Sequence, residues 1–122
     1  MNELKQMWPE ADPNGKPLNS PGAKADNGKI RAFLMLSGFS NALEEVSKVT
    51  TLGANKYTPN GWVSVPDASN RYMDALARHL LKYGSGEYYD TGEGGLGTHH
   101  LAQVAWNALA VLELELRNEP PR

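Results

Sequence analysis

The first thirty residues constrain the fold most, because prolines and glycines interrupt them throughout. Prolines recur at every fourth position, at Pro9, Pro13, Pro17 and Pro21. A proline inside a helix removes a backbone hydrogen bond and clashes with the preceding turn, and inside a sheet it leaves a ladder hydrogen bond unmade. The sequence therefore predicts an extended arm over residues 1–36, packed on a body formed by residues 37–118. Within the arm, residues 30–36 are apolar and are expected to form a short strand or the first turn of a helix.

The composition indicates one globular domain and excludes several classes of protein. The chain has 122 residues, of which 40% are hydrophobic and 21% are charged, as in ordinary soluble domains. Its net charge of −2 gives no positive field that would attract duplex nucleic acid. The absence of cysteine excludes disulfides, thiolate zinc sites and cysteine nucleophiles. Because the sequence has no signal-peptide pattern and no apolar run near the roughly 18 residues of a membrane span, we expect a cytoplasmic protein without a membrane partner.

Three amphipathic segments predict helices over residues 41–52, 69–83 and 98–117. Asn41 is expected to cap the first helix and Gly53 to end it. Three short helices bury only a modest core, so we expect oligomerisation to a dimer or tetramer to complete the fold. Trp106 supports this expectation, because it lies away from the apolar face of the third helix when positions are projected at about 100° per residue.

Acidic side chains gather at two places where they could hold a metal ion. Glu45 lies at the edge of the apolar face of the first helix, whereas Glu44 lies outside it, in a capping-box position close to Lys48. The glycine-rich loop that follows the second helix carries acids at three-residue intervals, at Glu87, Asp90 and Glu93. Carboxylate oxygens are the ligands that Mg²⁺ and Mn²⁺ accept. The alternatives are a salt bridge for Glu45 and a flexible acidic loop that binds nothing.

Two histidines lie where they could serve the same site. His100, Gln103 and Asn107 form a polar stripe on the first half of the third helix, beside its apolar face. The same stripe becomes apolar further along, which indicates a site rather than a solvated face. His79 lies at the inner edge of the second helix, where a hydrogen-bonded structural histidine is the alternative to a functional one.

Short segments in one order along residues 22–116 carry a resemblance to a known family. They are Gly22-Ala23-Lys24-Ala25-Asp26, Gly28-Lys29-Ile30-Arg31, Ala42-Leu43-Glu44-Glu45-Val46 leading to Gly53-Ala54-Asn55-Lys56-Tyr57, Arg71-Tyr72 with Arg78-His79-Leu80, Gly86-Glu87 with Asp90, and His100-Leu101-Ala102 with Ala105-Trp106-Asn107. This order resembles the phage-type dATP/dGTP diphosphohydrolases. The resemblance implies an all-α, MazG-like helical bundle and Mg²⁺ or Mn²⁺ as cofactor. It also implies hydrolysis of a purine deoxynucleoside triphosphate, dGTP or dATP, to the monophosphate and pyrophosphate in phage nucleotide metabolism. If the protein is phage-encoded, the expected location is the host cytoplasm.

With the resemblance, the candidate residues acquire expected roles. The expected metal ligands are Glu44, Glu45, Glu87, Asp90 and Glu93. Glu45, His79 and His100 are the expected catalytic residues. Cations and aromatic or amide groups are expected to bind the substrate, at Lys24, Asp26, Lys29, Arg31, Lys56, Tyr57, Trp62, Arg71 and Asn107. The chain departs from the wider MazG-like pattern at Lys48, where a third carboxylate is usual, and at His100 and Gln103, where an ExxD motif would stand.

Two other functions fit parts of the sequence. A histidine/aspartate-coordinated phosphohydrolase could use His79, Asp90, His99 and His100 as ligands and release triphosphate or phosphate. A non-enzymatic accessory protein could bind single-stranded nucleic acid through Trp8, Trp62 and Trp106. The sequence contains no GxxxxGK[ST], HExxH or GxSxG motif, which excludes P-loop enzymes, zincins and α/β-hydrolases.

Overall fold

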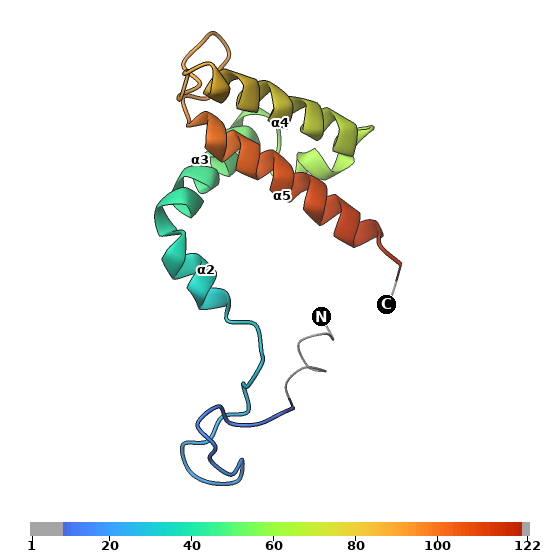
Figure 1. Ribbon diagram of the computed structural model, residues 1–122. Coiled ribbons are helices and arrows are strands. Elements are labelled where there is room, and N and C mark those ends of the chain that lie inside the picture. The colour runs from blue at the N-terminus through green and yellow to red at the C-terminus, as the bar shows by residue number, and fades with distance from the viewer. Residues whose placement is uncertain (1–8, 121–122) are drawn as a thin grey trace. The chain divides into compact units, whose positions relative to one another are not determined.

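A computed structural model describes residues 9–120, which divide between Gly38 and Phe39 into two compact units (Figure 1). The first unit contains the helix α2 (Ala32–Gly38), and the second contains α3 (Ser40–Lys56), the 3₁₀ turn η1 (Gly61–Ser64), α4 (Ala68–Gly84) and α5 (His100–Asn118). Within the described range there is no strand beyond one isolated β-bridge, so the predicted all-α class is confirmed. None of these helices combines the length and the apolar composition that crossing a membrane requires.

The first unit is a coil organised around a buried carboxylate. Asp12 is buried, and its two oxygens accept the backbone N–H groups of Asn14 (2.7 Å) and Lys24 (2.8 Å). The bond from Lys24, and then that from Asn14, holds the pKa of Asp12 below its ordinary value. Of the strand and helix considered for residues 30–36, the chain forms the helix, and none of the residues of α2 is buried.

In the second unit, α4 and α5 run antiparallel side by side, and α3 packs against α5 (Figure 1). The three predicted helices are all present, but α3 does not end at Gly53. It continues to Lys56, and the N–H of Tyr57 closes its last turn on the carbonyl of Gly53 (3.0 Å). A glycine inside a helix costs only about 1 kcal/mol, so the helix runs on until Pro59 disfavours it. The cap at Asn41 was also wrong, because α3 begins after Phe39 without a side-chain cap.

The core of the second unit is small and partly aromatic. Among the described residues, only Val49, Ala102 and Ala110 are buried apolar side chains. Trp106 packs edge-to-face on Trp62 and Tyr72, with ring centroids 5.8 and 5.5 Å away. The Tyr72 hydroxyl donates a hydrogen bond to the Trp62 carbonyl (2.7 Å). Trp106 therefore packs against partners within its own chain, so its position no longer supports the expected oligomerisation.

The inward face of α5 differs from the predicted one. His100, Gln103 and Asn107 are buried, whereas Leu109 and Leu112 on the apolar face are 46% and 52% exposed. Hydrogen bonds from the polar stripe to the preceding loop fix the rotation of the helix, and this rotation turns the leucines outward. His100 and Gln103 of the polar stripe thus face the loop that precedes α5.

Candidate metal centre

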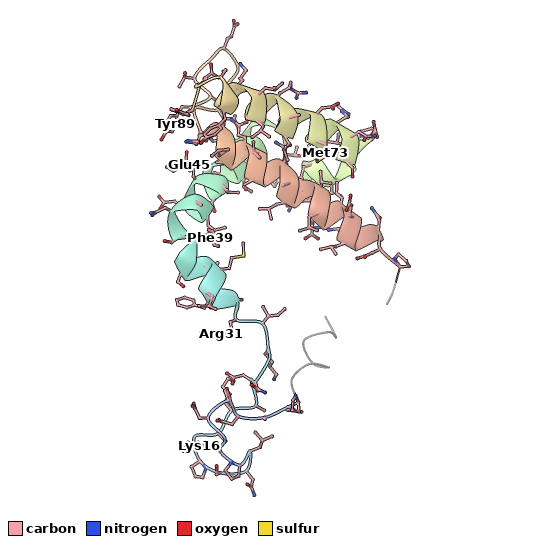
Figure 2. All side chains as sticks on the ribbon, viewed as in Figure 1. Lys16, Arg31, Phe39, Glu45, Met73 and Tyr89 are labelled. Carbon is pink, nitrogen blue, oxygen red and sulfur yellow. The ribbon has the colours of Figure 1, made fainter. Side chains whose placement is uncertain are left out.

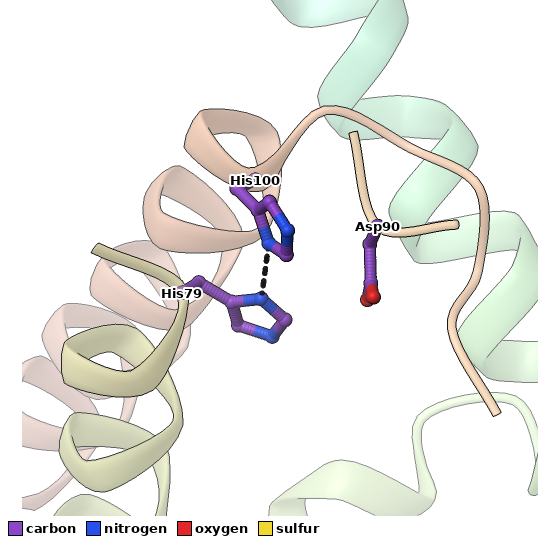
Figure 3. A group of neighbouring side chains, drawn as sticks. All are labelled: His79, Asp90 and His100. Carbon is purple, nitrogen blue, oxygen red and sulfur yellow. Dashed lines mark hydrogen bonds between the residues drawn. The ribbon is translucent and has the colours of Figure 1, made fainter. Parts of the chain in front are cut away.

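Three potential ligands from separate segments meet at the start of α5. His79 comes from the C-terminal half of α4, Asp90 from the loop, and His100 from the first position of α5 (Figure 3). One ligand atom from each lies within 4.8 Å of the others. His100 is fully buried, and His79 and Asp90 are half-buried. Two imidazoles and a carboxylate at this spacing form a group that could hold a metal ion.

Glu87 determines which nitrogen of His100 carries the lone pair. Its Oε2 lies 2.6 Å from Nε2 of His100, and an ionised carboxylate can only accept, so Nε2 donates. In the neutral form of the ring, the lone pair of His100 is therefore at Nδ1, where it accepts a hydrogen bond from Nδ1–H of His79 (2.9 Å). A carboxylate that fixes the tautomer of a histidine in this way is the usual outer partner of a metal-binding imidazole.

The electrostatic environment keeps His79 in the form that binds metals. Burial lowers the pKa of His79, and the negative charge of Asp90 opposes this shift only in part. The nearby His100 and the positive charge of Arg78 lower it further. The ring is consequently neutral at neutral pH, with a lone pair available to an ion.

A closed loop brings Asp90 to the histidines. Tyr89 and His99 form an antiparallel bridge, and Asp90 exchanges backbone hydrogen bonds across it, donating to the Thr98 carbonyl (2.9 Å) and accepting from Gly97 (2.8 Å). Gly95 lies against Asp90, where a Cβ atom would clash with both the carbonyl and the carboxylate oxygens. The glycine there permits a close approach that no other residue allows.

Gln103 holds the Asp90 carboxylate from the helix side. Its Nε2 donates to Oδ2 of Asp90 (2.8 Å) and to the hydroxyl oxygen of Thr98 (3.1 Å). The opposite orientation of the amide would place its oxygen against the carboxylate oxygen, where neither atom can donate. The amide nitrogen of Gln103 is therefore the atom that faces Asp90. Because Gln103 and Thr98 are both buried, the carboxylate is held in one orientation.

The donor set of this group, two imidazole nitrogens and one carboxylate oxygen, is one that a divalent transition metal accepts. The 2.9 Å contact between the two Nδ1 atoms is a hydrogen bond, so one of these atoms carries a proton. With Nδ1 of His100 as the acceptor, the lone pair of the neutral His79 ring is at Nε2. An ion bound between the two Nδ1 atoms would have to replace this hydrogen bond.

The five predicted acidic ligands are distributed unevenly around this group. Asp90 lies within it, and Glu87 contacts His100 at its edge and Lys82 at 3.8 Å. Glu44 and Glu93 are exposed outside it.

Glu45 lies on α3, beside the start of α5. It accepts the backbone N–H of His99 (3.3 Å) and pairs with Lys48 (3.1 Å). The Lys48 hydrogen bond, and then that of His99, lowers the pKa of Glu45, so its carboxylate is ionised. Glu45 and Tyr89 line an open hollow of about 320 Å³ between α3 and α5. Figure 2 shows the two residues close together where α3 meets the loop before α5.

The predicted substrate-binding residues fall in both units. The first unit contains Lys24, Asp26, Lys29 and Arg31. In the second unit, Lys56 lies over the ring of Tyr57 (5.3 Å), which is 73% exposed. Trp62 belongs to the aromatic cluster with Trp106, Arg71 donates to the Pro66 carbonyl (3.3 Å), and Asn107 is buried and donates to the Gln103 carbonyl (2.8 Å).

His99 does not join His100 in the group. Its Nδ1 accepts the N–H of Leu101 (3.0 Å) and so caps α5, and its ring lies among Tyr83, Tyr88 and Tyr89. Sequence reasoning assigned no role to Thr98 or Gly95, and it placed Gln103 on the polar stripe without a role. For Thr98 and Gly95, the one available signal was that both lie in the glycine-rich loop that carries Asp90 and precedes His100.

The family model described as dATP/dGTP diphosphohydrolase, N-terminal, matches residues 19–120. This range covers most of the chain, including α2 to α5 and all three residues of the candidate metal group. No curated protein and no solved structure is similar enough to this chain to count as a match.

Proposed function

Since the chain belongs to the dATP/dGTP diphosphohydrolase family, we propose that it hydrolyses a purine deoxynucleoside triphosphate, dGTP or dATP, to the monophosphate and pyrophosphate with the help of a divalent metal. The observation that carries this proposal is the group formed by His79, Asp90 and His100, whose ligand atoms lie within 4.8 Å of one another. Such a group next to a helix N-terminus suits a reaction in which phosphate charge must be neutralised.

The donor set favours Mn²⁺ over Mg²⁺ among the two expected cofactors. Imidazole nitrogens suit transition-metal ions, and Mn²⁺ is the transition metal of the two expected cofactors, whereas Mg²⁺ prefers oxygen ligands and retained waters. A divalent cation held by His79, Asp90 and His100 would neutralise phosphate oxygens and make an attacking water more acidic.

The chain's own residues would position that cation and the substrate. Glu87 fixes the lone pair of His100, and Gln103 fixes the orientation of Asp90. Glu45 is ionised beside the first turn of α5 and is our proposed acid–base residue or additional ligand, with Glu44 and Glu93 as further acidic candidates. Replacing Glu45 by Gln should lower turnover strongly, and unchanged turnover in a folded variant would remove Glu45 from the mechanism.

Substrate binding needs several cations, because a triphosphate carries about four negative charges. We propose Lys24, Lys29, Arg31, Lys56 and Arg71 for this role, all of which have exposed side chains. Asp26 and Asn107 are proposed to contact the purine edge. Of the two proposed stacking residues, the exposed Tyr57 is better available than Trp62, whose ring packs against Tyr72 and Trp106.

One observation favours a second candidate function. Three of the four residues considered for a histidine/aspartate-coordinated phosphohydrolase, His79, Asp90 and His100, do come together. Such an enzyme would release intact triphosphate or single phosphate instead of pyrophosphate.

Product analysis tests both candidates in one experiment. The protein is incubated with each of the four deoxynucleoside triphosphates and Mn²⁺ or Mg²⁺, and the phosphate products are separated by ion exchange. We expect pyrophosphate and monophosphate from dGTP or dATP, faster with Mn²⁺ than with Mg²⁺. Triphosphate with free nucleoside would favour the second candidate, and the absence of any product from all four nucleotides would overturn both.

A further inference from the structure

Two cations flank His79 on α4. Arg78 directly precedes this histidine and Lys82 follows it by three residues, so the two cations are one helical turn apart. Residues three or four positions apart lie on the same side of a helix. Both side chains are exposed, that of Lys82 by 57%. Helix α4 therefore presents two positive charges beside the histidine that it contributes to the metal group (Figure 3).

The positive charges of α4 lie close to the metal group. Nζ of Lys82 is 3.8 Å from Oε2 of Glu87, and the same oxygen is 2.6 Å from Nε2 of His100. Burial is the largest cause of the lowered pKa of His79, and the positive charges of Arg78 and Lys82 lower it further. Water and salt screen exposed charges, so such an effect is strongest at short range. Both cations therefore belong to the surroundings of the group.

The donors of both cations are available to a ligand. Between residues 9 and 120, neither the guanidinium of Arg78 nor the ammonium of Lys82 makes a hydrogen bond, and the 3.8 Å from Lys82 to Glu87 is longer than one. A guanidinium matches two phosphate oxygens with parallel N–H groups, and a lysine ammonium binds phosphate as a point charge. A phosphate could therefore bind here without breaking a hydrogen bond of the protein.

The charge of the metal group itself leaves the phosphates uncompensated. Asp90 belongs to the group and Glu87 contacts His100, so these two carboxylates balance the charge of a bound divalent ion. A triphosphate brings about four more negative charges. Positive side chains next to the group must offset part of them.

The other cations proposed for the second unit already have contacts elsewhere. Arg71 donates to the Pro66 carbonyl (3.3 Å), and Lys56 lies over the ring of Tyr57 (5.3 Å). The cations that flank His79 are therefore better placed to act together with the metal group.

We propose that Arg78 and Lys82 bind the phosphate groups of the substrate beside the metal group, in addition to the cations named above. This assignment rests on the proposed function for the identity of the substrate. The contacts are made to phosphate oxygens, so they are the same whichever base the nucleotide carries. Inorganic tripolyphosphate, which has no base or sugar, is therefore a sufficient probe.

Titration of the full, Mn²⁺-loaded chain with inorganic tripolyphosphate tests the assignment. Arg78→Gln and Lys82→Gln should each weaken tripolyphosphate binding by about 10-fold, as for the loss of one exposed hydrogen bond to a charged group. The same variants should bind Mn²⁺ alone as tightly as the wild type or more tightly, because a positive charge near the ion has been removed. Damage to the site would instead weaken the binding of both ligands. Such a joint loss, or tripolyphosphate binding within twofold of wild type in both variants, would overturn the proposal.

Two further variants control for charge and for structure. Arg117→Gln also removes one positive charge, but Arg117 pairs with Glu113 and lies over Trp62, about 25 Å along α5 from His100. This control should bind tripolyphosphate as the wild type does, and an equal loss in it would overturn a local role for the α4 cations. Lys82→Arg keeps the charge and should stay within about threefold of wild type.

Steady-state kinetics separate this proposal from the proposed function. If dGTP and dATP are hydrolysed, Arg78→Gln and Lys82→Gln should lower kcat/KM for both nucleotides by a similar factor. Unchanged kcat/KM in both folded variants would overturn the phosphate assignment and leave the proposed function standing. If no nucleotide is hydrolysed but the wild type binds tripolyphosphate and the two variants bind it weakly, the proposed function fails and the phosphate site stands.

Discussion

Replacing Gln103 by Leu should weaken metal binding without unfolding the protein. Leucine is similar in size to glutamine but donates no hydrogen bond, so the Asp90 carboxylate loses the donor at 2.8 Å and Thr98 loses the one at 3.1 Å. A hydrogen bond to a charged group contributes about 1.5–3 kcal/mol. The orientation of one of the three ligands would therefore be lost while the two histidines stay in place.

The expected size of the effect follows from the exposure of Asp90. Loss of a group that orients a metal ligand typically costs 10–100-fold in affinity, or about 1.4–2.7 kcal/mol. Asp90 is half-buried, so water can replace part of the lost bond, and the lower part of this range applies. We expect the dissociation constant for Mn²⁺ to rise about 10- to 30-fold.

Isothermal titration of the metal-free protein with Mn²⁺ measures this change, and the electron paramagnetic resonance signal of free Mn²⁺ provides a second readout. The matched control is Asn118→Leu, which removes an exposed amide bonded to the Leu114 carbonyl (2.9 Å) at the far end of the same helix. The control should bind Mn²⁺ as the wild type does. A dissociation constant within twofold of wild type for folded Gln103→Leu would refute the role assigned to Gln103.

Three further predictions concern the loop, the histidines and the core. Gly95→Ala should displace Asp90, because a Cβ atom has no room there, and titration should show weaker Mn²⁺ binding with α-helical circular dichroism unchanged. Because the folded pKa of His79 lies below its ordinary value of 6.5, the stability that depends on the neutral ring is fully present above pH 6.5 and is lost as the pH falls toward the folded pKa. Thermal unfolding temperatures should therefore fall as the pH is lowered below 6.5, and they should fall less in His79→Gln. Trp106→Ala should lower the free energy of unfolding by about 2–4 kcal/mol through loss of the contacts with Trp62 and Tyr72, as measured by urea denaturation, and a change below about 1 kcal/mol would contradict that packing.

Local patterns were sufficient to predict the helices and the polar stripe of α5. Helical periodicity is a short-range property, and His100, Gln103 and Asn107 share a face whatever surrounds the helix. Which face turns inward is a tertiary property, and here the hydrogen bonds from His100 to Glu87 and from Gln103 to Asp90 determine it. Apolar periodicity alone therefore pointed the leucines of α5 the wrong way.

The metal group could be predicted only in part, for a related reason. His79, Asp90 and His100 were each singled out, but their meeting depends on the closure of the loop between α4 and α5. That closure depends on the bridge between Tyr89 and His99 and on the space beside Gly95, neither of which has a periodic signal. The end of this loop also separates two neighbouring histidines, since His99 caps α5 whereas His100 belongs to the candidate metal group.

The carboxylate at the centre of the first unit gives that unit its own response to acid. The folded pKa of Asp12 is lowered by the N–H groups of Lys24 and Asn14, so its contribution is present above the ordinary value of 3.8 and disappears as the pH falls below it. The titration that loosens His79 begins near 6.5, well before this point. Acidification should consequently act in two steps. Protonation of His79 destabilises the second unit first, and protonation of Asp12, which removes the acceptor for the N–H groups of Asn14 and Lys24, follows at lower pH.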